Sequence, residues 1–503
     1  MTNPLYDALV APLAARNTPV LTDAAGRTLS GTELHDMALA LATALTGLGL
    51  QPGDRMAVQI DKSPRALALY LAALASGVVF LPLNTAYTAD EVEYFVSNAG
   101  AALLVGSPTR ADSLRAVATR HGARFETMDA AGDGSLTDLA GKAPAGFVPV
   151  DRGPEDLAAI LYTSGTTGRS KGAMLSQRNL LSNAEVLVEE WRFTDTDVLL
   201  HMLPIFHTHG LFVATNVVLL SGGSMIFLPG FKAEQAIDWL PKATTMMGVP
   251  TFYTRLLDDP RFTGDLVGHM RLFTSGSAPL LAETHVQFEE RTGHRILERY
   301  GMTETNMNTS NPYDGDRRAG TVGLPLPGVE LKITDPVTGA TLPQGEPGMI
   351  EVRGANVFKG YWQMPEKTKE ELRDDGFFIT GDIGVVDADG YVSIVGRQKD
   401  LIITGGYNVY PKEIELILDE QPGVLESAVV GVPHPDFGEA VVGVLVAQPG
   451  QTIDVDVVRA AMGQSLAKFK QPKHIAVVQE LPRNTMGKVQ KNLLRKDLSA
   501  LFA

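Results

Sequence analysis

Tyr162-Thr-Ser-Gly-Thr-Thr-Gly-Arg-Ser-Lys-Gly172 is a short run of glycine, hydroxyl and basic residues that directly follows the apolar run Leu157-Ala-Ala-Ile-Leu161. A buried strand that ends in such a loop can place backbone N–H groups and a lysine around phosphates. A flexible surface loop would account for the glycines and hydroxyls, but not for the position of Lys171. Ser170 stands where a Walker A loop has the glycine before its lysine. The stretch therefore predicts nucleotide phosphate binding by another scheme.

Length and composition restrict the class of protein. A chain of 503 residues is too long for one core and indicates several domains. The formal net charge of −15 disfavours nucleic acid and anionic membranes as partners. There is no cysteine, which excludes disulfides, thiolate metal sites and a cysteine nucleophile. The sequence shows neither a secretion signal nor an apolar stretch long enough to span a membrane, so we expect a cytoplasmic protein.

The order of hydrophobic patterns predicts the domain organisation. Strand-like runs alternate with helical patterns through the first 300 residues, as in Arg55–Ile60 followed by Pro64–Ala75, which favours parallel, doubly wound sheets. Residues 320–396 are richer in Gly and Pro and predict a distorted β-barrel. After Gly396 the pattern changes to a compact α+β unit that includes an amphipathic helix over Pro411–Leu418. We therefore predict an α/β fold with an N-terminal domain over 1–397 and a small C-terminal domain over 398–503.

Five motifs, in this order along the chain, resemble those of the adenylate-forming enzymes, which include acyl-CoA synthetases, aryl-CoA ligases, luciferases and peptide-synthetase adenylation domains. The glycine-rich loop is the first. The other four are Tyr300-Gly-Met-Thr-Glu304, Phe377-Phe-Ile-Thr-Gly-Asp382, Gly396-Arg-Gln-Lys-Asp400 and Pro482-Arg-Asn-Thr-Met-Gly-Lys488. The resemblance implies activation of a carboxylic acid by ATP, release of pyrophosphate and transfer of the acyl group to coenzyme A. It also implies a mobile C-terminal domain. The chain has no room for a carrier domain, so we expect free coenzyme A as the thiol.

The resemblance assigns expected roles in nucleotide binding. The phosphate donors would be Thr163, Ser164, Gly165, Thr166, Thr167, Gly168 and Lys171. Glu304 would bind Mg²⁺ together with Thr166, because magnesium prefers one or two carboxylates plus phosphate oxygens. The adenine segments would be Gly276, Ser277, Ala278 and Pro279 together with Tyr300, Gly301, Met302 and Thr303. Asp382 would accept hydrogen bonds from the ribose hydroxyls, with Arg397 close by.

The resemblance also predicts the residues of the two half-reactions. Lys488 would bridge the acid carboxylate and the α-phosphate and so offset negative charge in the transition state. Lys399 falls at the hinge of the C-terminal domain. Gly405 and Gly406 would then line a narrow channel for the pantetheine arm, since two glycines leave no Cβ atoms. Lys468 and Lys470 are candidates for contacting the nucleotide end of coenzyme A, although exposed lysines are often merely solvated.

Three segments bear on the acid. His207, in Pro204-Ile-Phe-His-Thr-His-Gly210, resembles the residue that gates the acyl pocket. Arg255 and Ser277 would pair with a second carboxylate, because a guanidinium holds a carboxylate by two hydrogen bonds. Arg299 is the best alternative to Arg255, ahead of Arg291 and Arg295, because it directly precedes the nucleotide motif. Met302 would also contact the substrate.

These segments resemble the branch of the family that activates malonate, so the expected substrates are malonate, ATP and coenzyme A, with Mg²⁺. The sequence leaves open whether methylmalonate is accepted. Three alternatives remain: a synthetase for another short-chain, medium-chain or aromatic acid, a luciferase-like oxygenase, and a nucleotide-binding protein without catalysis. Lys171, Glu304, Asp382, Arg397 and Lys488 together argue against the last of these.

Overall fold

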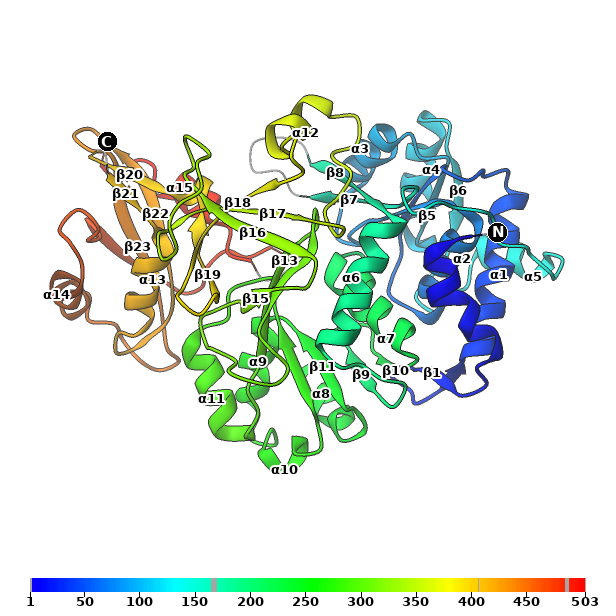
Figure 1. The fold of residues 1–503 in the computed structure, drawn as a ribbon, viewed down its shortest axis with the longest axis horizontal. Coiled ribbons are helices and arrows are strands. Elements are labelled where there is room, and N and C mark those ends of the chain that lie inside the picture. The colour runs from blue at the N-terminus through cyan, green and yellow to red at the C-terminus, as the bar shows by residue number, and fades with distance from the viewer. Residues whose placement is uncertain (1, 164–169, 406, 485–487, 503) are drawn as a thin grey trace. The chain divides into compact units, whose positions relative to one another are not determined.

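The computed structural model describes residues 2–163, 170–405, 407–484 and 488–502, and its chain divides into two compact units (Figure 1). The first unit comprises Met1–Glu330 and Val352–Phe378, and the second comprises Leu331–Glu351 and Ile379–Ala503. The boundary predicted between residues 397 and 398 is that of a mobile C-terminal domain. The division into compact units does not test this mobility, so the boundary stays a prediction.

Two sheets organise the first unit. The six-stranded sheet has the order β6 (Arg124–Thr127), β5 (Leu103–Gly106), β3 (Arg55–Gln59), β4 (Val79–Pro82), β7 (Leu157–Thr163) and β8 (Lys171–Ser176). The nine-stranded sheet has the order β15 (Leu324–Pro325), β14 (Asn306–Ser310), β13 (Leu297–Met302), β12 (Leu272–Ser275), β11 (Thr245–Gly248), β9 (Val198–His201), β10 (Ser224–Phe227), β1 (Pro19–Thr22) and β2 (Thr28–Ser30). Both sheets are parallel at their centres and antiparallel at an edge. The prediction of α/β sheets is confirmed.

Helices cover these sheets. In chain order they are α1 (Gly31–Gly47), α2 (Pro64–Ser76), α3 (Ala89–Ala99), α4 (Ala111–Arg120), α5 (Ser135–Lys142), α6 (Gln177–Glu190), α7 (Asn216–Ser221), α8 (Ala233–Trp239), α9 (Pro250–Leu257), α10 (Gly264–Val267), α11 (Ala282–Thr292) and α12 (Pro365–Glu371). Shorter helical turns are η1 (Tyr6–Val10), η2 (Ala11–Ala15), η3 (Pro108–Arg110), η4 (His209–Thr215) and η5 (Leu240–Lys242). Residues of α8–α11 bury apolar side chains against β9–β12 in one core cluster, and these green helices lie beside the strands in Figure 1.

Local sequence explains where these helices begin and end. α1 begins with a capping box in which Ser30 accepts from the N–H of Glu33 while the Glu33 side chain accepts from the N–H of Ser30. α2 has Ser63 as its N-cap and Pro64 in its first turn, and it ends at Gly77 in the left-handed region. α9 likewise begins at a proline, Pro250. The helix expected at Pro64–Ala75 is therefore confirmed within a residue.

The second unit is a small α+β domain. Its five-stranded sheet has the order β21 (Tyr407–Val409), β20 (Ile402–Thr404), β23 (Gly438–Ala447) and β22 (Val424–His434), with β24 (His474–Val478) also paired to β23. Its helical elements are η6 (Gln398–Asp400), α13 (Pro411–Asp419), α14 (Val455–Ser465) and α15 (Lys491–Asp497). A four-stranded sheet, β16 (Val329–Thr334), β17 (Gly348–Gly354), β18 (Phe378–Val386) and β19 (Val392–Arg397), occupies the region expected to form a distorted barrel.

No helix within the described residues is both long and apolar enough to cross a membrane.

Candidate active site

The glycine-rich stretch joins two antiparallel strands. β7 is buried through most of its length and pairs with β8 so that Thr163 lies opposite Lys171. This confirms the expected buried strand before the loop and places Thr163 and Lys171 at its two ends. The other predicted phosphate donors lie outside the described residues: Ser164, Gly165, Thr166, Thr167 and Gly168.

Lys171 is held by a carboxylate and a phenol from a distant part of the chain. Its Nζ lies 3.0 Å from both carboxylate oxygens of Glu371 and 3.1 Å from the hydroxyl of Tyr361. The Tyr361 hydroxyl is 2.6 Å from Glu371 Oε2 and 3.1 Å from Glu304 Oε1. Burial raises the pKa of Glu371, but hydrogen bonds from Tyr361, Lys367 and Lys171 outweigh it and bring the pKa below its ordinary value. The ammonium of Lys171, which is predicted to bind phosphate, is therefore paired with the Glu371 carboxylate in this structure.

Backbone pairing brings these side chains together. The segment that carries Tyr361 runs beside β8, since Trp362 N–H donates to Gly172 O at 2.7 Å. Next to it, Phe358 N–H donates to Glu304 O at 2.8 Å. Tyr361 is thereby fixed between the lysine of the loop and the predicted metal ligand.

Glu304 fits the role of a magnesium ligand. Its side chain is buried, and burial raises its pKa above the ordinary value. A divalent cation would favour the ionised form that burial disfavours. No group of three or more His, Cys, Asp or Glu suited to a metal is found among the described residues. One carboxylate suits Mg²⁺ that arrives with nucleotide phosphates.

The remaining segments of the first unit meet at the carboxyl ends of adjacent parallel strands. β9, β11, β12 and β13 are neighbours in that order. The chain that leaves β9 carries His207 and His209, β12 leads to Gly276–Pro279, and β13 itself ends at Tyr300–Met302. In open α/β sheets the carboxyl edge is where ligands bind. The topology therefore brings the predicted adenine segments and the predicted acid segment to one edge.

Arg299 is a buried cation at this edge. It is 3 % exposed, and its Nε and Nη2 atoms have no hydrogen-bond partner among the described residues. Its guanidinium lies against the backbone of Gly276, where an added Cβ would be 2.1 Å from Nη1. Burial lowers the pKa of Arg299 to about 9, so the side chain is still charged at neutral pH. A buried cation with two donors to spare is matched to an anion with two acceptor oxygens.

His209 and Ser277 lie beside one another. Ser277 Oγ is 3.3 Å from His209 Nδ1, and Ser277 has a positive φ of 69°, a backbone conformation that is strained for a residue with a side chain. Burial, followed by the nearby Arg299 cation, holds the pKa of His209 well below its ordinary value. The imidazole is therefore neutral, and its buried Nε2 has no partner among the described residues. His207 is only partly buried, and its Nδ1 accepts the N–H of His209 at 3.3 Å.

Arg255 does not belong to this set. It lies on the exposed side of α9, whereas Tyr253, Leu256 and Leu257 of the same helix are buried. The prediction that Arg255 holds a buried carboxylate is wrong, because its side chain is directed to solvent. Of the four arginines considered from the sequence, Arg299 is the buried one with unused donors, while Arg291 donates to Leu257 O and Arg295 pairs with acidic residues on the surface.

The second unit contains the predicted ribose, hinge and thioester residues. Asp382 and Arg397 face each other across β18 and β19 and form an ion pair of 3.0 Å. Burial, followed by Arg397, lowers the pKa of Lys399. Gly405 has φ +57°, and Gly406 lies outside the described residues. Lys488 is partly buried, and its N–H donates to Asn484 Oδ1 at 3.0 Å.

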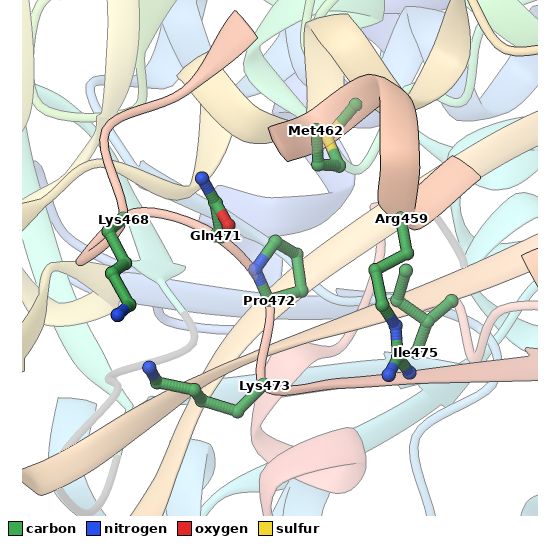
Figure 2. A pocket seen from close by; sticks show the side chains of 7 residues that line it. All are labelled: Arg459, Met462, Lys468, Gln471, Pro472, Lys473 and Ile475. Atoms are coloured by element: carbon green, nitrogen blue, oxygen red, sulfur yellow. The ribbon is translucent and has the colours of Figure 1, made fainter. Parts of the chain in front are cut away.

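A basic pocket lies in the same unit (Figure 2). Its lining includes three cationic side chains, and in Figure 2 Lys468 and Lys473 lie on one side of Pro472 while Arg459 lies beside Ile475. Lys470, which was predicted alongside Lys468, instead binds Glu413 at 2.7 and 2.8 Å. The pocket can therefore receive an anionic group through Lys468 but not through Lys470.

Comparison with known proteins agrees with this arrangement. The AMP-binding enzyme family matches residues 11–362, and the C-terminal domain of AMP-binding enzymes matches residues 413–488. The chain belongs to the AMP-binding enzyme family.

Within this family, the crystal structure of ATP-bound MatB from Rhodopseudomonas palustris is 58% identical, has a TM-score of 0.98, and each chain covers 100% of the other. A malonate–CoA ligase from Arabidopsis thaliana is 35% identical over 90% of this chain and 79% of that protein. A sulfoacetate–CoA ligase from Cupriavidus necator is 34% identical over 97% of both proteins.

Sequence reasoning missed several residues that this AMP-binding enzyme gathers around its candidate site. Tyr361 and Glu371 stand in no motif and reach Lys171 only through the pairing of distant segments. His209 is two residues from the predicted His207, and the sequence offers no sign of which imidazole is buried. Arg299 was not missed, since the sequence already indicates it beside Arg255, and it is two positions after the apolar Leu297 and so on the same face of its strand.

Proposed function

We propose that this AMP-binding enzyme is a malonate–CoA ligase. It would convert malonate, ATP and coenzyme A into malonyl-CoA, AMP and pyrophosphate through a malonyl-adenylate. The single observation that carries the choice of acid is the buried guanidinium of Arg299, with two unused donors beside Gly276. A second carboxylate on the acid supplies the anion that this cation lacks.

A monocarboxylic acid would not satisfy the pocket. It would leave Arg299 buried without a counterion, a situation that costs about 3–5 kcal/mol when one partner of a buried pair is absent. A pocket built for a simple fatty or aromatic acid would be expected to lack this arginine. The curated relatives that act on malonate and sulfoacetate take short acids with a second anionic group, which is the same chemical class.

Residues of this chain supply the rest of the first half-reaction. Lys171 would exchange Glu371 for the phosphates, and Glu304 would hold a magnesium ion that, when bound, would neutralise phosphate charge. His209 and Ser277 present neutral polar groups to the acid, while Arg299 fixes its distal carboxylate. Lys488 stabilises the negative charge that develops when the proximal carboxylate approaches the α-phosphate.

Coenzyme A enters in the second half-reaction. We assign its anionic nucleotide end to Lys468 and the neighbouring cations of the second unit, and its pantetheine arm to the backbone at Gly405. The domain over 398–503 would rotate about a hinge at Lys399. This rotation would move Lys488 away from the reacting carboxylate and bring the pantetheine channel at Gly405 into its place. A cytoplasmic location and the absence of nucleic-acid, membrane and carrier-domain partners remain part of the proposal.

The test is CoA-dependent AMP formation with malonate, methylmalonate, sulfoacetate, succinate, acetate and octanoate. We expect malonate to have the highest kcat/KM and the product to have the mass of malonyl-CoA. Lys488→Ala is the matched control for adenylation, since it should abolish AMP formation with every acid. A preference for acetate or octanoate would refute the proposed substrate, and a preference for sulfoacetate would replace malonate with the other dianion.

A further inference from the structure

Lys62 is a cation that the reaction does not use. It lies in the turn between β3 and α2, and its Nζ is 2.9 Å from three acceptors: His201 Nδ1, His201 O and Leu203 O. The same ammonium lies 4.2 Å from the centre of the Phe227 ring. All three of its N–H donors are therefore occupied, and among the described residues none of its partners is a carboxylate.

The hydrogen bonds define the protonation states. His201 Nε2 is 2.9 Å from Gly210 O, which can only accept, so Nε2 carries the proton. Burial, followed by the Lys62 cation, holds the pKa of His201 well below its ordinary value, so its Nδ1 is an acceptor. Burial also lowers the pKa of Lys62, but three acceptors and an aromatic face favour the ammonium. Lys62 thus donates to the imidazole, and the imidazole donates to Gly210.

These bonds close the loop between β9 and η4. At its start, Lys62 holds the carbonyls of His201 and Leu203. At its end, Gly210 O accepts from His201 Nε2 and, at 2.9 Å, from the hydroxyl of Thr215. The two ends are close together, because a Cβ on Gly210 would lie 2.1 Å from Pro204 O. The loop that these bonds close contains both histidines of the candidate acid pocket, His207 and His209.

We propose that Lys62 and His201 are positioning residues that hold the 203–210 loop so that His209 meets Ser277 in the acid pocket. They touch no substrate and act through the loop backbone. The effect should fall on the acid and not on ATP, because the Lys171, Tyr361, Glu371 and Glu304 group is held by other segments. The inference rests on the proposed function only for the identity of the acid.

The experiment compares Lys62→Met, Thr215→Val and a control. Arg55 provides the control, since its guanidinium also grips three backbone carbonyls, those of Gly53, Ala99 and Gly100, at the other end of β3. KM for the acid, KM for ATP, kcat and Tm are measured for each variant. The acid is whichever one the wild type prefers in the panel above, so that a wrong choice of malonate does not affect the test.

We expect Lys62→Met to raise KM for the acid about tenfold, because small misplacements of pocket groups have effects of that size or larger. KM for ATP should stay within about twofold. Thr215→Val, which removes one hydroxyl, should raise the acid KM less, and the double variant should show less than the product of the two effects. Arg55→Met should lower Tm without changing the acid KM.

Several results would overturn the inference. One is an unchanged acid KM in both Lys62→Met and Thr215→Val. Another is an equal rise in the two KM values, and a third is an Arg55→Met enzyme with the same kinetic profile as Lys62→Met. If Lys62→Met does not fold, Thr215→Val decides alone, since it removes only the hydroxyl that donates to Gly210 O and lies 3.3 Å from His201 Nε2.

Discussion

Replacing Arg299 by methionine removes the cation that we assign to the distal carboxylate while keeping an apolar side chain of similar length. In the structure the guanidinium is 3 % exposed and has two donors without a partner among the described residues. A bound carboxylate that loses this partner is left buried and uncompensated, which costs about 2–5 kcal/mol. At 1.4 kcal/mol per factor of ten, kcat/KM for malonate should fall by roughly 30-fold to 4000-fold.

The same substitution should help acids without a second carboxylate. Propionate and butyrate would no longer leave a buried cation unpaired, so their kcat/KM should be unchanged or higher. Arg255→Met is the matched control, because it removes an arginine from the exposed side of α9 and should change neither substrate. The assay is AMP formation at saturating ATP and coenzyme A with each acid varied.

The selectivity ratio is the informative quantity. An equal loss of malonate and propionate activity in Arg299→Met would mean that the arginine supports the fold or the nucleotide site. A malonate activity that survives in Arg299→Met but is lost in Arg255→Met would refute the reasoning and restore the assignment first made from the sequence.

Three further predictions follow from the same geometry. The KM for malonate should be constant near neutral pH and rise above pH 9, because the pKa of Arg299 is about 9 and only the protonated guanidinium binds the carboxylate. A KM that stays constant up to pH 10 would contradict this. Gly276→Ala should lower kcat/KM for malonate by at least about tenfold, because its Cβ would lie 2.1 Å from Nη1 of Arg299 and displace the guanidinium. Unchanged malonate kinetics in a folded variant would show that the position of the guanidinium against Gly276 is not needed. Glu371→Gln should lower KM for ATP several-fold, since it weakens the two 3.0 Å contacts that hold Lys171 away from phosphate; a higher KM for ATP would show that Glu371 aids nucleotide binding instead.

Patterns that are local in the sequence predicted much of the fold. The alternation of apolar strand runs and helical patterns predicted the doubly wound sheets, because both patterns are local in the chain. Helix α2, expected at Pro64–Ala75, begins after the N-cap Ser63 and ends at Gly77, both of which are local features of the sequence. The neighbours of each strand, and hence the edge where the loops meet, could not be read in this way.

The assignment of Arg255 shows where motif reasoning failed. Tyr253, Leu256 and Leu257 mark the apolar side of a helix, and Arg255 falls outside that stripe. Helical periodicity therefore places Arg255 on the exposed side of the helix, away from the buried set. Arg299, by contrast, shares a strand face with the buried Leu297.

Contacts between distant segments were beyond sequence reasoning. Tyr361 and Glu371 reach Lys171 across 190 and 200 positions, and Lys62 reaches His201 across 139. Each of these pairs depends on how strands and loops are ordered in space. Polar residues outside any motif carry no sign of that order.

The central claim is that Arg299 selects an acid with a second carboxylate. The most direct measurement is a crystal structure of Lys488→Ala with ATP and malonate, in which slowed adenylation retains both substrates. We predict that the distal carboxylate lies about 3 Å from both Nε and Nη2 of Arg299, as a two-bond pair. A malonate whose distal carboxylate binds elsewhere, with Arg299 paired to a protein group or to water, would contradict the account.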